Sequence, residues 1–276
     1  MICTKMGPNK LDFRGAWQYN YEKSKKREFK MDLELYQLLL IAAVALFASF
    51  IQSVTGFGFG IFAMIFLPHL LSFGEANALS TMLSTLTSLS VMIVMLRKIS
   101  WKNIIFPMIG CLITTVLSVY FIKSQENKFL TFLLGIALFA LSIYFFFFSK
   151  KIKIKPTWYA GLIAGTLSGV MGGMFSMSGP PVVIYFMQSE DSSEKYLATV
   201  SAYFVLSNIF SIVTKASAGF ITVNVWVAFL IGFVGMAAGA LFGKLARNKM
   251  NPEMIKKAVY AVMAASGAVN IIMFFI

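Results

Sequence analysis

Residues Gly172–Pro181 have the sequence GGMFSMSGPP and interrupt an apolar stretch, 157–188, that is long enough to lie in a lipid bilayer. A membrane helix tolerates one glycine or one proline, but glycines, serines and a proline pair at this density break it. The hydrocarbon of a bilayer offers no water to pair the freed backbone groups, so such a break persists only beside protein or a water-filled cavity. The stretch therefore predicts a broken membrane helix that is covered by protein or faces a water-filled cavity.

The composition of the whole chain agrees with a membrane location. Of the 276 residues, 58% are hydrophobic and 13% are charged, and the mean hydropathy is +0.78. The charged share is about half that of soluble domains. These values predict an integral membrane protein and exclude a water-soluble core of this size.

The net charge of +13 reflects membrane topology, because the Lys and Arg residues after residue 30 lie almost entirely in the loops between apolar runs. We therefore expect no nucleic-acid partner. Cys3 and Cys111 do not suggest a disulfide framework, and His69 is the only histidine. No cluster of His, Cys and carboxylate residues is present in the sequence, so we expect no metal site, no cofactor and no catalytic residue.

Eight apolar segments follow Met31, and two of them are longer than one membrane crossing. The long segments, 33–72 and 157–188, each have a glycine-rich interruption and each begins a group of four. An offset of 116 residues pairs Gly56 with Gly172 and Gly60 with Ser176. This pattern predicts two internal repeats, at 31–150 and 151–276. Broken segments at matching places in two halves indicate the binding site of a transporter.

The loop charges distinguish two topologies. If each broken segment crosses the membrane once, the Lys and Arg residues after Met31 divide eight to eight between the two sides. If each is a hairpin that returns to its starting side, they divide thirteen to three, and the three are Lys123, Lys128 and Lys215. The second division obeys the positive-inside rule. We therefore predict an all-α integral membrane protein, a polytopic helical bundle of two inverted-topology repeats, each a broken re-entrant hairpin plus three full spans.

Residues 1–30 differ from the rest of the chain because they are polar, basic and without helical periodicity. One hypothesis is that native translation starts at Met31, directly before the first hydrophobic run. The alternative is a genuine basic tail on the cytoplasmic side.

The two interruptions should meet near the middle of the membrane and form an anion site. The N-terminus of a half-helix presents free N–H groups and about half a positive charge, and glycine lets a ligand approach the backbone. Neither long segment contains Lys or Arg, so we expect a site without a cationic side chain. The predicted substrate-binding residues are Thr55, Gly56, Gly58, Gly60, Gly172, Gly173, Ser176, Ser178, Gly179 and Pro180, and Ser207 and Asn208 are candidates for the cavity lining.

Other glycines have a different spacing. Gly161, Gly165 and Gly169, like Gly235, Gly239 and Gly243, recur every fourth residue, which is typical of helix–helix contacts. Tight packing is also the alternative explanation for the glycines of the two interruptions. Glu75 and Glu194 begin equivalent helices, where we expect helix capping.

The motifs SVTGFGFG (53–60) and SGVMGGMFSMSGPPVVIY (168–185) resemble those of the TauE/SafE family of sulfite exporters and sulfonate uptake permeases. The resemblance covers about 33–276, and the second motif is the more specific. The first departs from the denser glycine of many members. Membership implies a multi-pass transporter of a bacterial cell membrane, often for sulfite or organosulfonates.

These observations predict a secondary transporter for a small anion such as sulfite, a sulfonate or a related organic anion, with alternating access around the paired breaks. The alternative is an anion channel, or a permease of other small solutes with the same site as its filter. The coupling ion, H⁺ or Na⁺, is left open. An enzyme is not expected, because His69 lies more than a hundred residues before the serines of SMSG.

Overall fold

A computed structural model describes residues 33–147, 155–246 and 252–276, and within these ranges all regular structure is helical. The predictions made for residues 1–30 fall outside them. The helices are α2 (Leu35–Thr55), α3 (Phe59–Phe66), α4 (Phe73–Val94), α5 (Trp101–Lys123), α6 (Asn127–Phe147), α7 (Trp158–Phe175), α8 (Gly179–Ser189), α9 (Ser193–Ala218), α10 (Val223–Ala246) and α11 (Pro252–Phe275), with the 3₁₀ turns η1 (Leu67–His69) and η2 (Leu96–Lys98).

Seven helices in the described ranges have the length and apolar composition needed to cross a membrane. Six of them, α4, α5, α6, α9, α10 and α11, are the predicted full spans, and the seventh is α2. Large apolar side chains such as Leu117, Val234 and Leu241 are more than half exposed. Such side chains suit contact with lipid rather than water.

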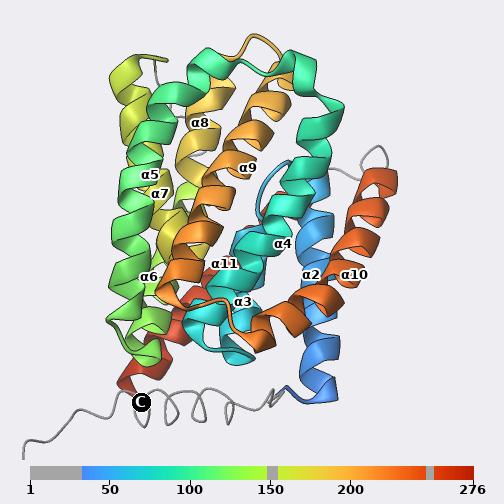
Figure 1. Cartoon of the computed structure of the whole chain (residues 1–276), viewed down its shortest axis with the longest axis vertical. Helices are drawn as coiled ribbons and strands as arrows, with labels where there is room; N and C mark the ends of the chain where they lie inside the picture. Colours follow the sequence, from blue (N-terminus) through green and yellow to red (C-terminus); the bar gives the residue numbers. More distant parts are fainter. Residues whose placement is uncertain (1–32, 148–154, 247–251) are drawn as a thin grey trace, which may run out of the picture. The chain divides into compact units, whose positions relative to one another are not determined.

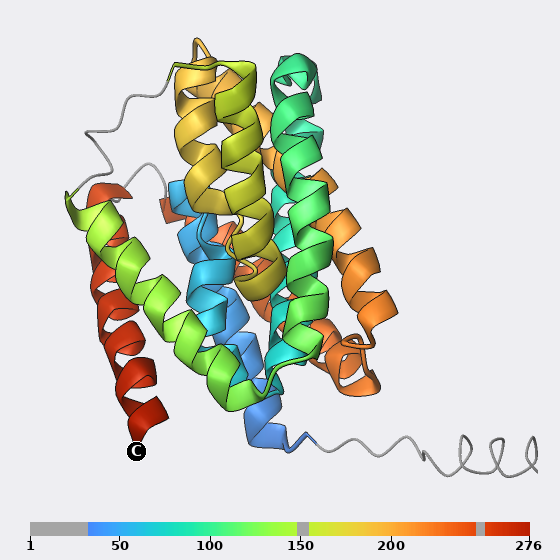
Figure 2. The same ribbon diagram turned by 90° about the vertical axis from the view of Figure 1, so that its left-hand side faces the viewer.

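Two pairs of helices form the broken hairpins. α2 and α3 are separated by Gly56–Gly58, and α7 and α8 by Ser176–Ser178. Figures 1 and 2 show that α2 and α3 share one end of the molecule and α7 and α8 the opposite end. The chain reverses at Gly56 (φ 86°), Gly58 (φ 107°) and Ser176 (φ 58°), all in the left-handed region that favours glycine.

The repeat register differs from the predicted one. α2 ends at Thr55 and α7 at Phe175, α3 begins at Phe59 and α8 at Gly179, and α4 begins at Phe73 and α9 at Ser193. Each of these pairs is 120 residues apart. The offset of 116 is therefore wrong at the breaks, where Gly56 corresponds to Ser176 and Gly58 to Ser178. The error arises because glycines recur every fourth residue along α7. Aligning the two repeats four residues out of register therefore pairs almost as many glycines as the correct alignment.

The largest helix contacts join the two halves. α2 packs mainly against α10 and α7 against α5, while α4 pairs with α9 and α6 with α11. Both predicted glycine stripes lie in these contacts: a Cβ on Gly165 would overlap the backbone of Pro107, and one on Gly239 that of Leu46. The packing role of these stripes is confirmed. The boundaries of the two repeats stay a prediction.

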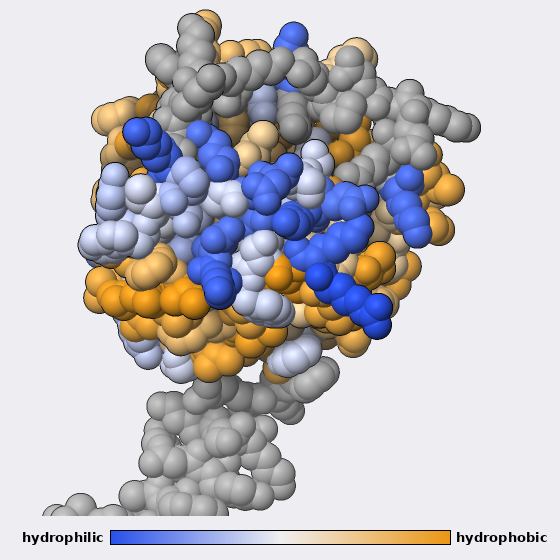
Figure 3. Space-filling model, turned by 90° about the horizontal axis from the view of Figure 1, so that it is seen from above, coloured by the Kyte–Doolittle hydropathy of each residue, from blue (hydrophilic) through white to orange (hydrophobic). Residues whose placement is uncertain are grey.

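Hydrogen bonds and an ion pair connect the helix ends and loops at the two ends of the bundle. At the end with α7 and α8, Lys98 pairs with Glu194, and the Ser100 hydroxyl donates to Glu190 at 2.7 Å. Figure 3 shows this end, with hydrophilic residues at its centre and hydrophobic residues around them. At the other end the Thr222 hydroxyl donates to Glu75 at 2.6 Å, and Glu75 also forms a capping box with Ser72, as predicted for the start of α4.

Candidate functional site

A cavity lies where the two breaks meet. Residues of both breaks and of the starts of α3 and α8 line it, together with parts of α2, α4 and α9. They are Gln52, Phe57, Gly58, Phe59, Gly60, Ile61, Ser84, Ser176, Met177, Ser178, Gly179, Phe204 and Asn208. The backbones of the breaks touch, since a Cβ on Gly60 would lie 2.7 Å from the carbonyl carbon of Ser176. Glycine at position 60 therefore permits this contact between the halves.

The N-terminus of α3 supplies backbone donors to this cavity. The first N–H groups of a helix have no partner within it, and no side chain caps α3 at Gly58. Phe59, Gly60 and Ile61, the first three residues of α3, all line the cavity. α8 is poorer in donors, because its second and third residues, Pro180 and Pro181, have no N–H. The two breaks therefore differ chemically, and α3 presents more N–H groups.

Side chains add further polar atoms to the lining. Asn208, on α9, is 7% exposed, and none of the described hydrogen bonds involves its side chain. Gln52, on α2, donates from its amide to Ser88 at 3.1 Å, which leaves its carbonyl oxygen available. A buried amide that borders a cavity without a protein partner is suited to bind a polar ligand or water.

The predicted site residues divide into two groups. Gly58, Gly60, Ser176, Ser178, Gly179 and Asn208 line the cavity. The others lie nearby but outside the lining: Thr55, Gly56, Gly172, Gly173, Pro180 and Ser207. Thr55 bonds through its hydroxyl to the carbonyls of Ile51 and Phe57, and a Cβ on Gly173 would press against Ser118 of α5. His69 is exposed in η1 and is also absent from the lining.

One cationic side chain near the cavity was not predicted. The loop-charge count places Lys215 among the loop residues, and this is wrong: Lys215 lies in α9 and its relative exposure is 0%. α9 continues to Ala218, and a helical side chain points back toward the N-terminus of its helix. Lys215 therefore extends from the last turn of α9 into the protein rather than into solvent.

Lys215 binds to α4 through two hydrogen bonds. Its Nζ donates to Asn77 Oδ1 at 2.9 Å and to Thr81 Oγ1 at 2.5 Å. The Thr81 hydroxyl in turn lies 2.9 Å from the hydroxyl of Ser176, which lines the cavity. The cavity lining itself contains no Lys or Arg, but a lysine from α9 lies two hydrogen bonds behind it.

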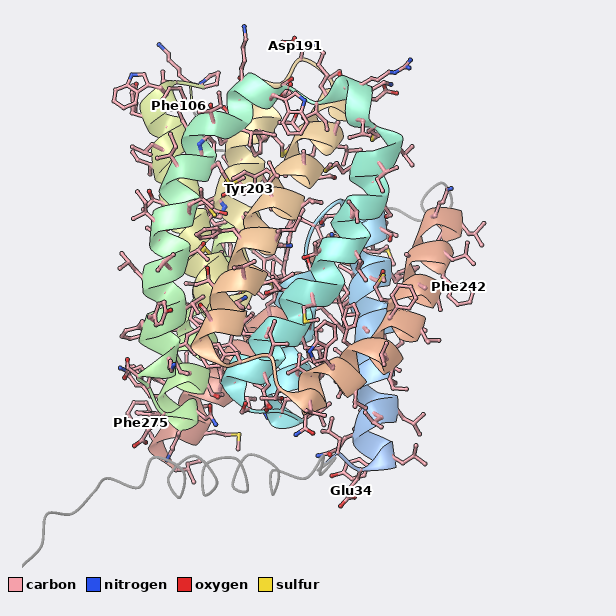
Figure 4. All side chains as sticks on the ribbon, viewed as in Figure 1. Glu34, Phe106, Asp191, Tyr203, Phe242 and Phe275 are labelled. Atoms are coloured by element: carbon pink, nitrogen blue, oxygen red, sulfur yellow. The ribbon has the colours of Figure 1, made fainter. Side chains whose placement is uncertain are left out.

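Asn77 connects the same group to the end of α7. Its amide nitrogen donates to the carbonyl oxygens of Gly173 at 2.7 Å and Met174 at 2.9 Å. These carbonyls lie in the last turn of α7, where intrahelical partners are missing. A residue of the first half thus caps a half-helix of the second. Figure 4 shows the side chains of the bundle, with Glu34 and Asp191 at opposite ends and Tyr203 between them.

A comparison with known protein families identifies the family of this chain. The model of the family described as Sulfite exporter TauE/SafE matches residues 41–269, which is most of the chain. The chain belongs to the TauE/SafE family. It is a multi-pass membrane protein and a transporter, as the resemblance of its two motifs implied, and both broken hairpins lie within or across the matched range.

A probable sulfite/organosulfonate exporter TauE from Cupriavidus necator is 22% identical over 243 residues. The aligned region covers 85% of this chain and 93% of that TauE protein. No solved structure matches the chain significantly.

The sequence contains little that distinguishes Lys215 from an ordinary membrane-anchoring lysine. It stands at the end of an apolar run, where lysines commonly extend to the interface. The available signal is the sequence TKASAG (214–219), in which Lys215 is followed by small residues before Gly219 ends the helix. Small residues leave no bulk to hold the side chain at the surface, but they do not show where it points.

Proposed function

We propose that this TauE/SafE transporter moves a small anion, such as sulfite, a sulfonate or a related organic anion, across the bacterial cell membrane. The anion binds in the cavity between the two breaks. The observation that supports this proposal is the cavity itself, which is lined by residues of both hairpins. A site shared by two halves is suited to be opened by movement of one half against the other.

The chemistry of the lining favours an anion over a cation. The free N–H groups of α3, the hydroxyls of Ser176 and Ser178 and the amide of Asn208 are all able to donate hydrogen bonds. The described lining has no carboxylate that would repel an anion. A sulfonate or sulfite offers three oxygen acceptors, which this set of donors can satisfy.

Access to the site would alternate between the two ends of the bundle. The α2–α3 hairpin lies toward one end of the bundle and the α7–α8 hairpin toward the other. Rocking of one hairpin with its partner helices would open one approach and close the opposite one. A channel would instead keep both approaches open together.

The test is binding followed by transport. Purified full-length protein is screened by thermal shift against sulfite, methanesulfonate, thiosulfate, sulfoacetate, taurine and simple carboxylates. We expect stabilisation by at least one sulfur oxyanion. In proteoliposomes, the same anion should show saturable uptake and counterflow. Binding of none of these anions would contradict the proposal, and flux without saturation or counterflow would favour the channel.

A further inference from the structure

Lys215 is a buried lysine without an anionic partner among the described residues. Its exposure is 0%, and no carboxylate in the described ranges pairs with it. Glu75 lies on the neighbouring helix α4, but its carboxylate oxygens accept from Ser72 and Thr222. Placing a charge inside a membrane protein is costly unless something balances it, so intramembrane lysines commonly mark functional sites.

The protein satisfies Lys215 only in part. An ammonium group has three N–H donors, and Asn77 and Thr81 accept two of them. The C-terminal ends of α7 and α9 lie close by, and their partial negative charges favour a cation. These dipoles are weaker than a full negative charge. The local structure therefore tolerates the ammonium but does not neutralise it.

The hydroxyl chain leads from this ammonium to the cavity. The Thr81 hydroxyl oxygen accepts from Lys215, so the Thr81 hydroxyl hydrogen is available to donate. Its acceptor is either the backbone carbonyl of Asn77 at 2.8 Å or the Ser176 hydroxyl at 2.9 Å. An anion that accepts from the Ser176 hydroxyl leaves the Ser176 oxygen as an acceptor for Thr81. All three groups then donate in one direction, from Lys215 through Thr81 and Ser176 to the anion.

From this geometry we propose that Lys215 is the residue that makes the cavity selective for anions. Its charge balances the transported anion through the Thr81–Ser176 hydrogen-bond chain, without direct contact. Lys215 is thus a specificity-determining residue supplied by α9, and Thr81 transmits its effect. The inference rests on the proposed function, because it assigns the charge that opposes the substrate.

The inference is tested by separating charge from shape. Methanesulfonate and methanesulfonamide have similar size, but only the first is an anion at neutral pH. Binding of both probes to full-length protein is measured by calorimetry for the wild type and for Lys215→Gln, whose amide can still donate a hydrogen bond. Lys123→Gln removes an exposed lysine from the last turn of α5 and is the matched control.

We expect the wild type and Lys123→Gln to prefer methanesulfonate. In Lys215→Gln, affinity for methanesulfonate should fall by roughly tenfold or more, as expected for a unit charge several ångströms away, while affinity for methanesulfonamide stays the same. Thr81→Val retains Lys215 and its bond to Asn77 but interrupts the chain. It should also reduce the preference for the anion, and it decides the question if Lys215→Gln does not fold.

Three results would overturn the inference. If the wild type binds methanesulfonate and both variants bind it with unchanged affinity, Lys215 has no role in selectivity, although the proposed function stands. If both variants lose affinity for the two probes equally, the role of Lys215 is structural. If the wild type binds none of the anions in the thermal-shift screen, the proposed function itself fails and the inference fails with it.

Discussion

Ser176 combines a strained backbone with a position in the cavity lining. Among the described residues it is the only non-glycine with a positive φ, whereas the equivalent residue of the first break is Gly56. A left-handed conformation costs a non-glycine residue about 1 kcal/mol. The serine hydroxyl bonds to Thr81 and borders the cavity, so the strain accompanies a side chain that glycine could not replace.

Replacing Ser176 with glycine should separate stability from binding. Ser176→Gly relieves the strained φ but removes the last hydroxyl of the chain from Lys215. We expect the melting temperature of the ligand-free protein to stay the same or rise, and anion affinity to fall by about tenfold, the value of one hydrogen bond to a charged group. Thermal unfolding and calorimetry measure the two effects. Ser124→Gly, at the exposed end of α5, should change neither.

Gly179 borders the cavity, and an added Cβ would fit there without a steric clash. A Cβ there would meet only ordinary contacts, at 3.5 Å from Phe57 and 3.7 Å from Phe204. We therefore expect Gly179→Val to insert and fold, while its methyl groups fill the anion site and abolish transport. Counterflow in proteoliposomes checks the activity, and size-exclusion chromatography checks the fold. Normal transport by this variant would place the anion elsewhere.

At the scale of helices, the glycine stripe of α10 holds α10 against α2. A Cβ on Gly239 would overlap the backbone of Leu46, and backbone atoms cannot move aside cheaply. Gly239→Val should separate the two helices and lower the yield of folded, monodisperse protein severalfold. Ala237→Val adds bulk to the exposed face of the same helix and should leave the yield unchanged. Equal yields would show that α2 and α10 do not pack this closely.

The cap that Asn77 provides for α7 leads to a second prediction at this scale. Asn77→Leu leaves the carbonyls of Gly173 and Met174 and one N–H of Lys215 without partners, at about 1–3 kcal/mol each. The melting temperature in detergent should drop strongly. Ser80→Ala is the control, because the buried Ser80 hydroxyl on the same helix has no partner in the described structure. This control should be neutral or slightly stabilising.

For the whole molecule, the opposed hairpins imply two chemically distinct faces. The α4–α5 and α8–α9 connections share one face through the Ser100–Glu190 bond, and the α5–α6 connection lies at the other end of α5. In a background without Cys3 and Cys111, an impermeant maleimide added to intact cells should label Gln125→Cys but not Asp191→Cys. The positive-inside rule places Asp191 in the cytoplasm. Labelling of Asp191→Cys but not of Gln125→Cys would show that the protein has the opposite orientation in the membrane.

Much of the helix pattern follows from the sequence. Apolar run length locates the six full spans, and glycine density locates the breaks at Gly56–Gly58 and Ser176–Ser178, because both depend on local chain properties. The glycine stripes, such as that containing Gly165, were likewise predictable, since spacing of four residues defines one helix face. The repeat register was not, because the same spacing of glycines allows a slip of four residues.

The sequence by itself determined the membrane location, the helical class, the two breaks and the family of this transporter. Only the tertiary structure decided which atoms surround the cavity. Gly60 and Ser176 are in contact although they lie in different halves of the chain, and Lys215 of α9 donates a hydrogen bond to Asn77 of α4. The physical reason is that the length of an apolar run and the spacing of glycines are local properties of the chain. The direction of a lysine side chain at the end of a helix instead depends on hydrogen-bond acceptors that are distant in the sequence. The position of Lys215 near the cavity is therefore a product of the fold.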